Sequence, residues 1–107
     1  MRNTSLAFFM VLMTSGSAYA GIDCKTLSDG KVKAIIGSWT KQGVIVDDHN
    51  GVVVNENLWR RTSEDVKVSI AIAEFCRQHP DSKGTIAVQG SIDHATVGQV
   101  VDGEWTQ

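Results

Sequence analysis

Residues 63–80 read SEDVKVSIAIAEFCRQHP, and the secondary structure of this run limits what the rest of the chain can build around it. Part of the run has an apolar residue at every second position, as a half-buried strand would: Val66, Val68, Ile70 and Ile72. Other features favour a helix. Thr62 or Ser63 can cap its first turn, and Glu64 and Asp65 place negative charge where the helix dipole attracts it. We therefore predict a long helix here.

The predicted helix covers 63–78 and ends before Pro80, because the residue preceding a proline avoids helical geometry. Its small or polar residues recur at i, i+4, i+7 and i+11, which predicts a narrow solvated stripe on an otherwise buried helix: Lys67, Ala71, Glu74 and Gln78. Ile70 and Ala73 should then face a sheet. Trp59 is expected to fold back onto the first turns of the helix.

Turn signals and periodicity place the other elements on either side of this helix. An amphipathic helix is predicted over 30–41, from apolar residues spaced i, i+3, i+4 and i+7. The β-branched runs 44–46 and 52–54 flank an Asn-Gly pair, the strongest short-range hairpin signal. After the long helix, the strand-like runs 85–92 and 99–105 flank a turn that starts with aspartate and ends with glycine.

The order helix, hairpin, long helix, hairpin predicts an α+β fold. We expect a small antiparallel sheet of two hairpins, packed against one long helix, with a shorter N-terminal helix. Residues 21–107 should form a single small domain, because 87 residues leave room for one core.

The N-terminal residues 1–20 have the pattern of an export signal. Arg2 precedes an apolar run that is too short for a membrane span, and Ala18-Tyr19-Ala20 matches the A-x-A spacing read by signal peptidase. We expect cleavage before Gly21 and no membrane anchor in the mature chain. The predicted location is the periplasm, with the extracellular space as the alternative.

Both cysteines, Cys24 and Cys76, remain after the predicted cleavage. An even pair in an exported chain predicts a disulfide, since the destination is oxidising and no C-x-x-C arrangement is present. The bond would close a loop of about 50 residues, for which chain entropy gives roughly 4 kcal/mol. A lipoprotein is not expected, because the acylated cysteine would have to follow the cleavage site directly.

The charge pattern argues against nucleic-acid binding. Nine basic and twelve acidic side chains remain after the predicted signal, a formal charge of −3, and no basic block is present. The densest basic positions are Lys31 with Lys33 and Arg60 with Arg61, which we interpret as solvated surface.

No catalytic constellation is recognisable. All three histidines fall in predicted turns or at a helix end: His49, His79 and His94. His49 follows two aspartates, Asp47 and Asp48. His94 follows Asp93. These residues could bind a metal together if the two hairpin tips met in space. We predict no catalytic residue, no metal and no cofactor.

The three tryptophans suggest a different kind of site. Trp39 and Trp59 lie within apolar patterns and are expected in the core. Trp105 lies among polar residues near the end of the last strand, which leaves two alternatives. It either anchors a protein interface, or a bound glycan, or it folds under the sheet and completes the core.

One arrangement of residues is similar to a known group. A W-x(7)-K spacing, an alanine-bearing helix ending in cysteine, and two strands around D-x-x-T-x-G resemble small exported bacterial α+β domains of uncharacterised function. The matching residues cover about half of the mature chain: Trp59, Lys67, Ala71, Ala73, Cys76, Asp93, Thr96 and Gly98. The resemblance implies a bacterial, periplasmic setting and brings no catalytic residues.

The sequence thus predicts an exported, disulfide-stapled module that binds another envelope or secreted protein. Trp105 is the candidate interface residue. The alternatives are a small envelope hydrolase or metal-dependent enzyme using the His and Asp residues of the hairpin tips, and a glycan-binding module using Trp105.

Overall fold

The computed structural model describes residues 23–107, so the predicted signal peptide and its cleavage site lie outside the described residues. Three α-helices and five strands follow a short 3-10 turn, in this order: η3 (Cys24–Thr26), α1 (Asp29–Lys41), β1 (Ile45–Asp47), β2 (Val52–Val54), α2 (Glu56–Arg60), α3 (Glu64–Gln78), β3 (Thr85–Gly90), β4 (Thr96–Val101) and β5 (Glu104–Thr106). None of the helices in this range is long and apolar enough to cross a membrane.

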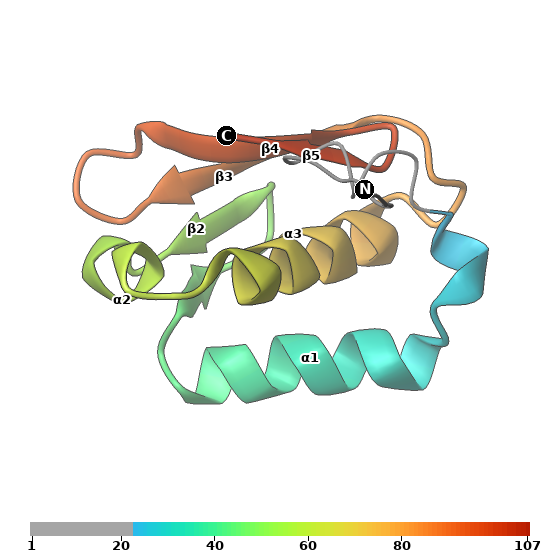
Figure 1. The fold of residues 1–107 in the computed structure, drawn as a ribbon, viewed down its shortest axis with the longest axis horizontal. Helices are drawn as coiled ribbons and strands as arrows, with labels where there is room; N and C mark the ends of the chain where they lie inside the picture. The colour runs from blue at the N-terminus through green and yellow to red at the C-terminus, as the bar shows by residue number, and fades with distance from the viewer. Residues whose placement is uncertain (1–22) are drawn as a thin grey trace, which may run out of the picture.

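The strands form one mixed sheet in the order β1-β2-β3-β4-β5 (Figure 1). Three neighbouring pairs are antiparallel, whereas β2 and β3 run parallel, with Val52 opposite Val88 and Val54 opposite Gly90. The α+β class is confirmed, but the sheet is not purely antiparallel. The helices α2 and α3 carry the chain back across the sheet, so β3 starts at the same end as β2.

The long helix α3 lies between two layers (Figure 1). It contacts β3, β4 and β5 on one side and α1 on the other. Ile70 and Ala73 are buried, as predicted. The predicted solvated stripe is wrong, because Ala71 and Glu74 are fully buried. A helix covered on two sides has no wide solvated face.

Side-chain caps set where the helices begin. Ser28 Oγ accepts a hydrogen bond from Lys31 N at 3.1 Å at the start of α1, one residue before the predicted start. Asn55 Oδ1 accepts from Leu58 N at 3.0 Å and starts α2, a short helix that the sequence patterns did not predict. This helix positions the buried Trp59, whose ring lies beside the ammonium of Lys67 on α3, 5.8 Å from the ring centroid.

The C-terminal part contains one more strand than predicted. The run 99–105 is split between β4 and β5 by a tight turn at Asp102 and Gly103, which both have positive φ (50° and 88°). Two central residues with positive φ form the turn type that matches the twist of a hairpin. At the other end, β3 stops at Gly90, and Ile92 lies in the following turn with 66% of its surface exposed.

The predicted disulfide between Cys24 and Cys76 is present, with a Cα–Cα distance of 5.3 Å. It ties the 3-10 turn η3 to the last turns of α3. Ser82 Oγ accepts a hydrogen bond from Cys24 N at 2.8 Å, so the chain after α3 also holds this turn in place.

Candidate functional site

The sheet has one face that no helix of the described residues covers, and we call it the outer face (Figure 1). Its members follow from the register, because residues paired across neighbouring strands point to the same side. Val53 pairs with Gln89, and Ala87 with Gln99, while the buried Val88 and Val100 point to the helices. The outer face consists of Asp47, Val53, Thr85, Ala87, Gln89, Thr96, Gln99, Val101, Glu104 and Thr106.

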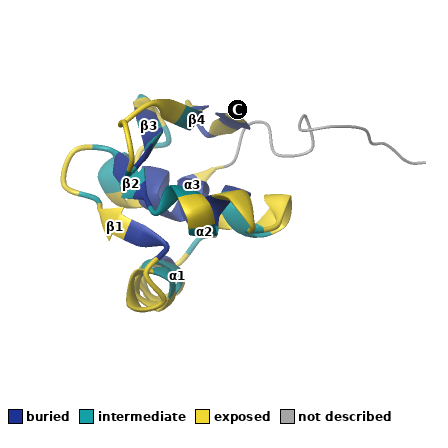
Figure 2. Ribbon diagram, turned by 90° about the vertical axis from the view of Figure 1, so that its left-hand side faces the viewer, coloured by how far each residue is buried: buried dark blue, intermediate teal, exposed yellow. Residues whose placement is uncertain are grey.

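The outer face carries little charge. None of the five strands contains a lysine or an arginine, and their only charged residues are Asp47 in β1 and Glu104 in β5. Between these two edge strands lie β-branched, alanine and glutamine side chains. Along the strands, buried positions lie beside exposed or intermediate ones (Figure 2), and the residues of the outer face belong to the second kind; Val101 is 39% exposed. The middle of the sheet therefore offers a neutral, partly apolar surface to solvent.

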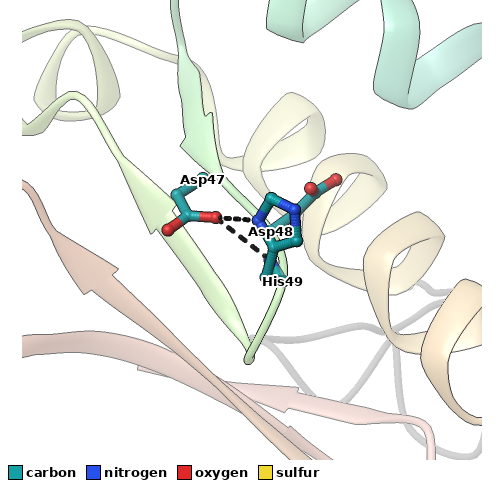
Figure 3. Close-up of side chains that lie close together, drawn as sticks. All are labelled: Asp47, Asp48 and His49. Carbon is teal, nitrogen blue, oxygen red and sulfur yellow. Dashed lines mark hydrogen bonds and ion pairs between the residues drawn. The ribbon is translucent and has the colours of Figure 1, made fainter.

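The tip of the first hairpin contains the aspartates and histidine singled out in the sequence (Figure 3). Asp47 Oδ1 accepts hydrogen bonds from His49 N at 3.1 Å and from the His49 ring at Nδ1, 2.7 Å away. This contact lowers the pKa of the Asp47 carboxyl and raises that of the His49 imidazole. Both side chains are largely exposed, so the pair stabilises the turn at the molecular surface.

A second polar group joins this hairpin tip to α3. Arg77 Nε donates to Glu74 Oε1 at 3.0 Å, and Arg77 Nη2 donates to the backbone oxygen of Asp48 at 2.6 Å. Gln78 Nε2 donates to the backbone oxygen of Gly51 at 3.2 Å. Two hydrogen bonds from the last turns of α3, donated by Arg77 and Gln78, therefore hold the loop between β1 and β2.

Glu74 is a charged residue that is fully buried, the only one within the described range, with 0% of its surface exposed. Burial, together with the neighbouring Asp48 carboxyl, raises the pKa of Glu74 to about 8, although Arg77 acts in the opposite direction. Oε2 of Glu74 has no hydrogen-bond donor among the described residues. The contact between the two carboxyls favours a proton on Glu74, which can then donate to the Asp48 carboxylate.

The two histidine clusters do not meet. Asp47, Asp48 and His49 have ligand atoms within 4.8 Å of one another and are the residues in the described range that could hold a metal ion. Their loop precedes β2, whereas the loop of His94 follows β3. Because these strands run parallel, the two loops lie at opposite ends of the sheet. The condition for a joint metal site is not fulfilled.

Trp105 lies in the core, with 3% of its surface exposed. Its ring packs edge-to-face on Trp59, with the centroids 6.3 Å apart, and its Nε1 donates to Glu64 Oε2 at 2.9 Å. A Cβ at Gly98 would lie 2.1 Å from the Trp105 ring, so this glycine makes room for it. Of the two sequence alternatives, the structure favours the core. The prediction that Trp105 is an exposed interface anchor is corrected, because the side chain of this residue in β5 faces α3.

The sequence patterns do not show the outer face or the buried polar group. They predict that Glu74 lies in a solvated stripe, and they assign no role to Arg77. One signal was available: Glu74 is the only charged residue in the run SIAIAEFC, where solvation of a carboxylate would be costly. Gln99 lies in the valine-rich strand 96–101, and only the register of the sheet shows which side of the strand it faces.

Comparison of the chain with protein-family models, with curated proteins and with solved structures finds no match. The outer face is formed by all five strands, and the Asp47–His49 pair lies at its margin.

Proposed function

We propose that this chain is an exported, non-enzymatic module that binds another protein of the envelope or the extracellular space through the outer face of its sheet. One observation carries the proposal: no described helix covers the outer face (Figure 1), and its inner strands β2, β3 and β4 present only Thr, Gln, Val and Ala there. Depletion of charged residues is what distinguishes the centre of a protein interface from ordinary surface.

The disulfide supports the export part of the proposal. A bond between Cys24 and Cys76 persists in oxidising compartments and is rare where thiols are kept reduced. Together with the signal pattern of residues 1–20, this favours the periplasm, with the extracellular space as the alternative. The resemblance to small exported bacterial domains points the same way.

The two edge strands fit binding through the face rather than through strand addition. β1 and β5 are each three residues long, and each carries an acidic side chain, Asp47 or Glu104. Short, charged edges discourage pairing with a strand of another chain. A partner is therefore expected to pack against side chains of the inner strands.

A charge placed at the centre of the outer face tests this function. Gln99 is exposed and pairs with Ala87 on one side and Thr106 on the other, so Gln99→Lys should fold normally and bury an unpaired ammonium in any complex. Gln42→Lys is the matched control, since Gln42 is the exposed C-cap of α1 in the helical layer.

The two variants and the wild-type chain serve as baits for cross-linking and pull-down from a periplasmic extract. A protein captured by the wild type and by Gln42→Lys, but reduced at least tenfold with Gln99→Lys, supports the proposal. Equal capture by all three baits places the interface elsewhere, and a partner bound only through the helical side contradicts the proposal.

A further inference from the structure

A hollow of about 480 Å³ lies on the helical side of the molecule, between η3, the first turns of α1 and the end of α3. This volume is within the range of small-molecule sites. Its floor is apolar and includes Leu27, Val32, Pro80 and the disulfide. The hollow is separate from the outer face, because α3 and the sheet lie between them.

The walls of the hollow concentrate positive charge. Lys25, Lys33 and Arg77 line it, against a single acidic residue, Asp29. The whole chain has a net charge of −2, so this excess is local. Neither lysine ammonium has an ion-pair partner among the described residues. Two uncompensated ammonium groups beside an apolar floor favour an anionic ligand.

The third cation is held in a fixed position. Arg77 Nε donates to Glu74 Oε1, and Arg77 Nη2 donates to the Asp48 backbone oxygen and lies 3.7 Å from Asp48 Oδ2, while 40% of the Arg77 side chain stays exposed. A guanidinium oriented by two partners loses little rotamer entropy when it binds a ligand. The buried Glu74 carboxyl thus has a second role, because it positions this cation at the wall of the hollow.

We propose that the hollow binds an amphiphilic anion: one phosphate or carboxylate group against Lys25, Lys33 and Arg77, with a short apolar body on the floor formed by Leu27 and Val32. Charge and shape both select this class. A neutral ligand would leave the two ammonium groups without a counter-charge, and a small inorganic anion would leave the apolar floor in contact with water.

The binding test uses the oxidised mature protein and four probes, with the three amphiphilic ones kept below their critical micelle concentrations. Octyl phosphate represents a lipid-like phosphate, and octanoate represents a fatty carboxylate. Octyl glucoside lacks the negative charge, and inorganic phosphate lacks the apolar chain. Isothermal titration should show saturable binding of octyl phosphate, octanoate or both, at least tenfold tighter than either incomplete probe. The stronger of the two amphiphiles identifies the source of the natural anion.

Charge reversal locates the site. The double variant Lys25→Glu/Lys33→Glu changes two exposed side chains and should weaken binding at least tenfold. Lys41→Glu, at the far end of the same helix, is the matched control and should bind like the wild type. The proposal is overturned if no probe binds saturably, if octyl glucoside binds as well as the anions, or if the double variant retains full affinity.

Glu74→Ala separates positioning from direct contact. It removes the partner of Arg77 Nε and should weaken anion binding, whereas Glu74→Gln keeps an acceptor oxygen and should preserve it. Near-UV circular dichroism shows whether Glu74→Ala is folded. Equal affinity of the two folded variants would contradict the positioning role, and if Glu74→Ala does not fold, the lysine variants decide.

Discussion

The buried carboxyl of Glu74 should make the stability of this protein fall as the pH rises. Its pKa is raised from 4.5 to about 8 in the folded chain. Between these values the folded state holds a proton that the unfolded chain has released, so the free energy of unfolding decreases with pH. Each pKa unit corresponds to about 1.36 kcal/mol, which sets an upper limit of about 5 kcal/mol between pH 4 and pH 9.

Glu74→Gln tests this linkage, because an amide has nearly the shape of the protonated carboxyl and does not titrate. Its oxygen can accept from Arg77 Nε and its NH₂ group can donate to Asp48. Urea unfolding at several pH values, followed by tryptophan fluorescence, should show similar stability of wild type and variant near pH 4. At pH 9 the variant should be more stable, by up to several kcal/mol.

The exposed Glu104 provides the control, since Glu104→Gln should leave the pH profile within about 0.5 kcal/mol of the wild type. The titration of His49 occurs in all three proteins and cancels in the comparison. Parallel pH profiles for wild type and Glu74→Gln would refute the reasoning, because they would show that Glu74 is ionised, or free to reach water, across this range.

Three further predictions concern the core. Gly98→Ala should lower the free energy of unfolding in urea by about 1–3 kcal/mol, because the new Cβ meets the Trp105 ring. Gly37→Ala, in a helix and with nothing within 4 Å of the new Cβ, should raise it by roughly 0.5–1 kcal/mol. Equal effects of the two substitutions would disprove the packing of Trp105 on β4. Trp105 should be inaccessible to iodide or acrylamide in the folded chain when measured in a Trp39→Phe variant, since Trp59 is buried as well, and efficient quenching would return Trp105 to the surface. Cys24→Ser/Cys76→Ser should lower the free energy of unfolding by roughly 4 kcal/mol, and a loss below about 1 kcal/mol would mean that the unfolded chain gains little freedom from opening this loop.

The local features of this fold were readable from the sequence, and the arrangement of layers was not. The helix predicted over 63–78 is observed as Glu64–Gln78, because capping by Ser63 and the acidic first turn are local signals. The prediction of a solvated stripe is wrong at Glu74. The periodicity rule assumes a helix with one solvated side, whereas α3 has α1 on one side and the sheet on the other.

The parallel pairing of β2 with β3 shows the same limit. Turn residues report how two consecutive strands are joined, but β2 and β3 are separated by two helices, and no local signal specifies their relative direction. Trp105 was readable in principle: with a period of two, the polar Glu104 and Thr106 turn outward and place the tryptophan inward. For the outer face and the hollow, the sequence supplied the residues, and only the tertiary structure showed which of them are neighbours.

The parallel pair at the centre of the sheet affects the order in which the chain can fold. Val52 pairs with Val88, and the helices α2 and α3 lie between them in the chain, so both strands of the first hairpin are synthesised before their central neighbour β3. During that interval the two inward valines of β2 face water. Closing so long a loop is slow compared with forming either hairpin. Synthesis from the N-terminus thus leaves the first hairpin with an open edge until β3 pairs with β2.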